Sequence, residues 1–158
     1  MKKIIVILAA ILAFGMTASA QRQYVGYATA GILTHINDTY DIHPGIDIAG
    51  GVRNYNRDAF VSFAYGAEAF AFWLPSADSS DFGIYAIPQI GVAIGPKGFK
   101  VYPHSGFMAG YSKNIGTFNL GSNGGIALDF GKNITLDFVG YYIFNQAWST
   151  AVNVTWRF

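Results

Sequence analysis

Imidazole and carboxylate groups lie close together in one polar segment of the chain. Positions 35 to 43 hold two histidines and two aspartates, namely His35, Asp38, Asp41 and His43. Such groups can bind a divalent transition metal. The alternative is a solvated loop in which the polar residues form turns. A flexible loop rarely fixes the geometry of a ligand set, so we expect no metal here and no other cofactor.

A serine-rich segment offers a second kind of chemistry. A serine hydroxyl needs a neighbouring base before it can act as a nucleophile. His35 could supply that base in a lipid acyl transferase or deacylase. The candidate serines and acids are Ser76, Asp78, Ser79, Ser80 and Asp81. These are also common loop residues, and His104 and Ser105, a second pair, point to opposite faces if they lie in a strand. The sequence therefore favours a protein that is not an enzyme.

Other charged and strongly polar side chains are few and recur about once or twice per segment of the chain. They are Asp47, Arg53, Glu68, Gln89, Lys100, His104, Asp129, Asp137 and Arg157. Charges at this spacing could line a path for small solutes or could pair with one another inside a fold. The chain has no cysteine, which excludes disulfides, zinc–thiolate sites and thiol nucleophiles.

Seven turn-rich clusters divide the chain after residue 20 into eight segments of roughly 10 to 15 residues, the length of a tilted membrane strand. Clusters one, three, five and seven include the longest and most polar, whereas two, four and six are tight. Gly, Pro, Asn, Asp and Ser end strands there for backbone reasons. The clusters span residues 35–43, 54–57, 75–81, 95–98, 112–116, 131–133 and 145–148.

Apolar and polar residues alternate along most of these segments, which is typical of strands. In 134–144 the apolar residues Ile134, Leu136 and Phe138 share one face, opposite Thr135 and Asp137. Segment 84–94 shows the same period of two, and in the third segment Val61, Phe63 and Tyr65 lie opposite Ser62 and Glu68. In segment 23–34 the pattern is too weak to assign the faces.

Two architectures fit eight alternating strands, and composition decides between them. A soluble lipocalin-like barrel would need a polar exterior, but only 12% of residues are charged and 52% are hydrophobic. The polar residues are too few to cover that exterior and suit a narrow interior, which eight strands fill with their own side chains. We predict an all-β, eight-stranded, antiparallel, up-and-down transmembrane barrel with both termini on the periplasmic side. Its aromatic residues should face lipid, with Tyr and Trp at the headgroups.

Charges inside such a barrel should meet opposite charges, because an unpaired buried charge is costly. Asp137 and Arg157 have the same facing on neighbouring strands, so we expect them to pair. Arg53 and Glu68 could join them in lining a conducting path. The preferred interpretation is a polar network that plugs the interior, with a narrow channel as the alternative.

The first twenty residues predict an export signal. Lys2 and Lys3 precede an apolar stretch that is too short to span a bilayer, and Ala18-Ser19-Ala20 supplies the small residues of a cleavage site. We expect residues 1–20 to be a cleaved signal peptide and 21–158 a single barrel domain. The mature chain would carry eight basic and nine acidic residues, a net charge of −1, with no basic patch for nucleic acid.

The C-terminal strand carries apolar residues at alternate positions and ends on an aromatic residue: Val152, Val154, Trp156 and Phe158. This pattern resembles the signal read by the barrel assembly machinery of the outer membrane. Residues 121–158 (GSNGGIALDF, GKN, ITLDFVGYY, then AVNVTWRF) resemble the small OmpA/OmpX-type barrel family, also described as porin-like. The outer loops are shorter than in that family and no peptidoglycan-binding domain follows, so cell-wall anchoring is not implied.

The resemblance implies a monomeric protein in the outer membrane of a Gram-negative bacterium, in contact with lipid and lipopolysaccharide. We expect a structural or surface-interaction role. The alternatives are the lipid-modifying enzyme, a narrow solute channel and a soluble periplasmic carrier barrel. Surface partners could meet the aromatic residues near the outer rim, which are Tyr40, Trp73, Phe82 and Trp148. Their other role is the interfacial aromatic girdle.

Overall fold

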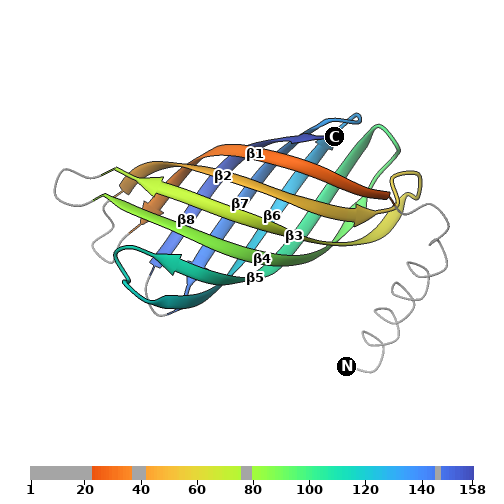
Figure 1. The fold of residues 1–158 in the computed structure, drawn as a ribbon. Coiled ribbons are helices and arrows are strands. Elements are labelled where there is room, and N and C mark those ends of the chain that lie inside the picture. Colours follow the sequence, from red (N-terminus) through yellow and green to blue (C-terminus); the bar gives the residue numbers. More distant parts are fainter. Residues whose placement is uncertain (1–22, 37–41, 76–79, 145–146) are drawn as a thin grey trace, which may run out of the picture.

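The computed structural model describes residues 23–36, 42–75, 80–144 and 147–158, which form one closed antiparallel barrel (Figure 1). The expected signal peptide, residues 1–20, lies outside the described residues. The described part contains no helix that is long and apolar enough to cross a bilayer. The strands are β1 (Gln23–Ile36), β2 (Ile42–Tyr55), β3 (Val61–Leu74), β4 (Asp81–Ile94), β5 (Phe99–Ser112), β6 (Phe118–Phe130), β7 (Ile134–Ile143) and β8 (Ala147–Arg157).

Each strand pairs with the next along the chain, and β1 pairs with β8 to close the sheet. The closing register runs from Tyr27 opposite Arg157 to Ile36 opposite Trp148. Closure gives every strand two neighbours, so no edge leaves a row of unpaired backbone groups. The predicted fold, eight antiparallel strands in an up-and-down barrel, is confirmed.

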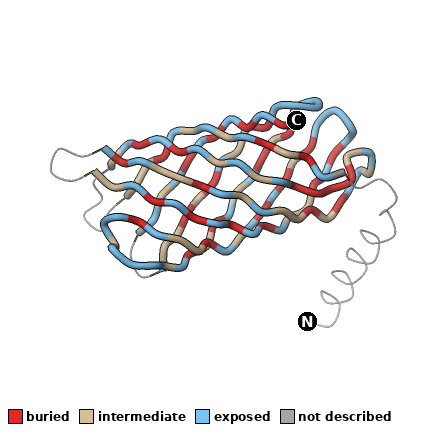
Figure 2. The backbone as a smooth tube through the Cα atoms, in the orientation of Figure 1, coloured by how far each residue is buried: buried red, intermediate tan, exposed pale blue. Residues whose placement is uncertain are grey.

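Burial alternates along the strands, as Figure 2 shows by colour. On β4, Tyr85, Ile87 and Gln89 are buried, while Ile84 and Ile90 are exposed. Apolar residues therefore cover the outside of the barrel, and polar residues turn inward with some large apolar ones. The structure also orients β1, which the sequence did not: its odd-numbered residues from Val25 onward face the interior.

The connections divide between two ends of the barrel. We call the end that holds the C-terminus and the turns 56–60, 95–98 and 131–133 the terminal end. The loop end is the opposite end, with the connections 37–41, 75–80, 113–117 and 144–146. Connections at the two ends are of similar length, so the expected contrast between long loops and tight turns is weak.

Several expected strand ends are displaced in the structure. His35 and His43 were expected in a loop, but they pair across β1 and β2, because backbone pairing continues past polar side chains. Trp148 likewise lies within β8. The second turn starts at Asn56 rather than Asn54, because the Asn56 side chain accepts hydrogen bonds from the backbone N–H groups of Asp58 (2.9 Å) and Ala59 (3.3 Å).

An exposed ion pair links two turns at the terminal end. Lys97 Nζ lies 2.8 Å from Asp58 Oδ1, and both side chains are largely exposed. The pKa of the Asp58 carboxyl lies below its ordinary value, because Lys97 donates a hydrogen bond to it and adds a favourable charge. Pairs of this kind add little to stability.

Gly31 is required by a close contact inside the barrel. A Cβ at this position would lie 1.7 Å from Asn153 Oδ1 and 2.8 Å from Asp47 Oδ1. Gly50 faces outward, and its nearest neighbour, the Tyr27 carbonyl oxygen, would be 3.7 Å from an added Cβ. Only the inward glycine therefore makes room for buried polar side chains.

We predict that Gly31→Ala lowers the free energy of unfolding by about 1–3 kcal/mol, because the added methyl group overpacks the interior. Gly50→Ala is the matched control and should leave stability equal to or slightly above that of the wild type. Urea unfolding in lipid vesicles measures both. Equal stability of the two variants would contradict the account.

Candidate functional site

The interior of the barrel contains all nine polar residues that the sequence singled out. Glu68 and Asp137 are half-buried. The other seven are buried, each with at most 7% of its surface exposed: Asp47, Arg53, Gln89, Lys100, His104, Asp129 and Arg157. Inward-facing positions on seven strands supply the set, so closure of the sheet brings together residues that are far apart in the sequence.

Arg157 anchors the polar contacts near the terminal end. Its guanidinium lies 2.6 Å from Asp129 Oδ2 and donates a hydrogen bond of 2.8 Å to the Tyr55 hydroxyl. Asp129 also accepts hydrogen bonds from Tyr55 and, at 2.6 Å, from Thr135. This carboxylate is thus neutralised and hydrogen-bonded at once, which makes its burial tolerable.

The expected pairing of Asp137 with Arg157 is wrong. Asp137 is opposite Asn153 in the β7–β8 register, and Arg157 lies four residues further along β8. Four residues of strand separate positions by roughly 13 Å. Asp137 Oδ1 lies 3.0 Å from His104 Nε2 instead. The alternation of the strands correctly placed both residues inside the barrel, but it did not determine their positions along the barrel axis.

Two further cations close the terminal end by binding carbonyl groups of the turns. Lys100 Nζ donates to the carbonyl oxygens of Ala59 and Gly95, the latter at 2.8 Å. Arg57 reaches from the β2–β3 turn to the β6–β7 turn, where it donates to Gly131 (2.9 Å) and Lys132 (2.8 Å). Together with Arg157, these side chains tie the turns to one another across the mouth.

Aromatic rings contact Arg53, Glu68 and His104 in the middle of the barrel. The Tyr27 hydroxyl donates a hydrogen bond of 2.8 Å to Glu68. The Arg53 guanidinium lies 5.2 Å from the Tyr27 ring and 4.2 Å from the Tyr102 ring, which is the range of a cation–π contact. Tyr102 in turn stacks on His104 at 5.1 Å. Ions and rings therefore fill this level of the interior together.

Five of the nine tyrosines that the structure describes are buried in the interior, which corrects the expectation that aromatic residues face lipid. They are Tyr27, Tyr55, Tyr85, Tyr102 and Tyr141. All lie at inward positions of the alternation, so the strand period was a signal that could have found them. The aromatic girdle was expected near the loop end, and Trp73, Phe82 and Trp148 are indeed exposed there. Tyr40 lies outside the described residues.

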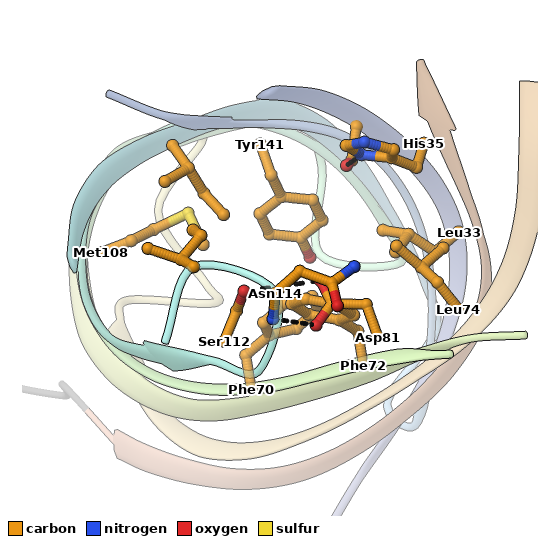
Figure 3. Close-up of a pocket in the computed structure, with 13 residues that line it drawn as sticks. Leu33, His35, Phe70, Phe72, Leu74, Asp81, Met108, Ser112, Asn114 and Tyr141 are labelled. Carbon is orange, nitrogen blue, oxygen red and sulfur yellow. Dashed lines mark hydrogen bonds between the residues drawn. The ribbon is translucent and has the colours of Figure 1, made fainter. Parts of the chain in front are cut away.

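The interior toward the loop end is apolar and contains a cavity of about 210 Å³. Phe70 and Tyr141 stack there at a centroid distance of 4.5 Å. Figure 3 shows Met108 on one side of the lumen and Leu33 with His35 on the other. The cavity is lined by Leu33, His35, Phe70, Phe72, Leu74, Asp81, Met108, Ser112, Asn114, Ile115, Tyr141, Ile143 and Ser149. Nothing in the sequence indicated this cavity, because residues from six strands and from the connection between β5 and β6 form it.

Polar groups gather at the mouth of this cavity. Asp81 accepts hydrogen bonds from the Asn114 backbone N–H (3.0 Å) and from the Ser112 hydroxyl (3.4 Å), and Figure 3 marks both contacts. His35 Nδ1 lies 3.0 Å from Ser149 Oγ on the neighbouring strand. The cavity thus has an apolar floor and a polar rim.

The candidate metal ligands are only partly described by the structure. His35 and His43 lie side by side on β1 and β2, while Asp38 and Asp41 lie outside the described residues. Among the described residues there is no cluster of three or more metal-ligating side chains.

The candidate catalytic residues are only partly described by the structure. Ser76, Asp78 and Ser79 lie outside the described residues, and the serine that contacts His35 is Ser149. This pair lines the lumen rather than the lipid-facing surface. His104 is buried inside the barrel, whereas Ser105 is exposed on the outer face and donates to the Asn123 carbonyl (3.0 Å). The adjacent His104 and Ser105 therefore cannot act as a dyad.

The apolar row of the last strand faces outward. Val152, Val154, Trp156 and Phe158 have 48%, 58%, 54% and 76% of their surfaces exposed. The backbone N–H of Phe158 donates to the Gly26 carbonyl at 3.0 Å, and its ring lies over Gly26. Phe158 therefore covers the end of the β1–β8 seam.

Comparison with known proteins gives similarity of fold. No protein-family model and no curated protein match the sequence. The structure of Neisserial surface protein A is similar, with a TM-score of 0.58 and 11% identity over 87% of this chain and 97% of that one. The outer membrane enzyme PagL has a TM-score of 0.54 and 10% identity over 82% and 97%.

A chain from the de novo design of transmembrane β-barrels is also similar, with a TM-score of 0.52 and 14% identity over 87% of this chain and all of that one. The fold is that of an eight-stranded transmembrane β-barrel. Natural and designed transmembrane barrels share it, so the common element is the closed sheet rather than any one site residue.

We predict that Arg157→Met lowers the free energy of unfolding by about 3–5 kcal/mol, because it leaves the buried Asp129 carboxylate without its cation. Adding Asp129→Asn should recover part of the loss, since no buried charge then remains. Denaturant unfolding in lipid vesicles measures both variants.

Lys97→Met is the control, because it removes the cation of the exposed pair with Asp58 and should change stability little. An Arg157→Met variant as stable as Lys97→Met would show that the buried pair does not support the fold.

Proposed function

We propose that this protein is an integral outer-membrane barrel with a closed lumen, and that its role is structural or is exerted at the loop end. The observation that carries the proposal is the combination of an apolar exterior with an interior blocked near the terminal end. Arg57, Lys100 and Arg157 bind turn carbonyls there. The outward-facing aliphatic and aromatic side chains would be unfavourable in water and are suited to contact with lipid.

The interior does not favour a solute channel. Arg157, Asp129 and Tyr55 contact one another directly, and the Tyr55 ring lies parallel to the Tyr102 ring at a centroid distance of 6.5 Å. An eight-stranded barrel has room only for its own side chains at such a level. On this proposal, the barrel does not conduct solutes across the membrane.

An outer-membrane location places the terminal end in the periplasm and the loop end at the cell surface. In that orientation the closed end faces the periplasm and the open cavity faces outward. The lumenal His35–Ser149 pair gives little support to a lipid-modifying enzyme, because lipid contacts the outer wall of the barrel. If the protein interacts with partners at the cell surface, the loop end is therefore the part that contacts them.

In planar lipid bilayers we expect the refolded protein to give no stable conductance steps, because Arg57, Lys100 and Arg157 bind turn carbonyls across the terminal end. An open porin reconstituted in the same bilayers is the positive control. Regular steps of porin size that scale with protein concentration would overturn the closed lumen.

We also propose that the outward row ending in Phe158 is the signal for the assembly machinery. Phe158→Asn should reduce the heat-modifiable band of folded protein in the outer-membrane fraction several-fold. Phe130→Asn is the matched control, because Phe130 is also an outward aromatic residue at the terminal end, with 44% of its surface exposed.

Equal losses in both variants would show that Phe158 acts only as a lipid-facing side chain. If the wild-type protein were recovered free in the periplasm, the outer-membrane location itself would be wrong.

A further inference from the structure

The cavity at the loop end has the build of a binding site for a small molecule. Its floor consists of the stacked rings of Phe70 and Tyr141 with Met108 beside them. Its volume, about 210 Å³, exceeds that of an engineered apolar cavity of about 150 Å³ that binds benzene. A single aromatic ring with a short substituent therefore fits the space.

The cavity lies in the lumen of the barrel rather than on its lipid-facing surface. Its lining residues alternate with exposed neighbours: Leu33 with Ile32, and Phe72 with Trp73. Asn114 and Ile115, from the connection between β5 and β6, border the cavity at the loop end. Its occupant therefore arrives from the aqueous side of the loop end, not from the acyl chains of the membrane.

The rim supplies a charge for such an occupant. Asp81 carries the one carboxylate among the described residues that line the cavity. Its two hydrogen bonds come from neutral donors, Asn114 N–H and Ser112 Oγ, and no Lys or Arg is among the described lining residues, in which His35 is the one base. A cationic amine at this rim would gain the carboxylate as a hydrogen-bond acceptor and the faces of nearby aromatic rings.

From this combination we propose that the loop-end cavity binds a small amphipathic aromatic amine, with the ring between Phe70, Tyr141 and Met108 and the amine at Asp81. The inference rests on the proposed function only in that it assigns the loop end to the cell surface. Polar rim and apolar floor define the orientation of the ligand, because a reversed ligand would bury its charge among rings.

The test uses the full barrel in lipid nanodiscs, since detergent molecules are themselves amphipathic and would compete for the cavity. Phenethylamine is the probe, and phenethyl alcohol is its uncharged counterpart. A ligand-observed NMR titration, with empty nanodiscs subtracted, should show saturable phenethylamine binding with a Kd below about 1 mM. If the phenethylamine signal showed no saturable binding beyond that of empty nanodiscs, the proposal would be overturned.

Two adjacent positions on β8 provide a matched pair of variants. Ser149 faces the cavity, whereas Thr150 is exposed on the outside. Ser149→Phe fills the cavity and should weaken phenethylamine binding at least about tenfold, whereas Thr150→Phe should leave it unchanged. Equal affinity in the two variants would overturn the site. Heat modifiability on gels verifies that each variant is folded.

Asp81→Asn tests the rim without changing the volume of the cavity, so it serves even if Ser149→Phe does not fold. It should weaken phenethylamine about tenfold and change phenethyl alcohol little. Asp58→Asn, which removes a carboxylate at the terminal end, is its control. Equal effects of Asp81→Asn on both probes would overturn the amine preference. Absence of binding would overturn the binding site but not the proposal of a closed lumen, which the conductance measurement tests separately.

Discussion

Pairing between β1 and β8 is the constraint on which the rest of this structure depends. A sheet in hydrocarbon must satisfy all of its backbone N–H and C=O groups, and only closure does so. The register from Tyr27–Arg157 to Ile36–Trp148 joins the two ends of the described chain. Phe158 extends this seam by its hydrogen bond to Gly26 and by its ring. Closure also creates the interior in which buried charges such as Arg157 and Asp129 meet.

The interior divides by chemistry along the barrel axis. Cations hydrogen-bonded to carboxylates and turn carbonyls occupy the terminal end, where Arg157 and Asp129 meet. Aromatic and aliphatic side chains such as Phe70, Tyr141 and Met108 form the core toward the loop end. Directional hydrogen bonds fix the first region, whereas the bulky side chains of the second leave a cavity between them. One end of the barrel is therefore plugged, and the other has the shape of a small receptor site.

Particular strands show how far sequence reasoning reached. The alternation in β8 gave the correct faces of Val152, Val154 and Trp156, because a period of two assigns sides without knowledge of partners. The same rule placed Asp137 and Arg157 inside the barrel but paired them wrongly. Their positions along the barrel axis depend on the register between β7 and β8 and on the tilt of the strands, which the alternation does not encode. The buried tyrosines were missed because hydrophobic character alone suggested lipid.

The sequence by itself determined the number of strands, their antiparallel order and the inward side of most of them. Those properties follow from local turn residues and from a two-residue period, which need no long-range contact. Only the tertiary structure decided which charges meet, where the lumen is blocked and that Asp81 stands over an aromatic cavity. Each of these depends on side chains from strands far apart in the chain, and their distances are set by closure and register together.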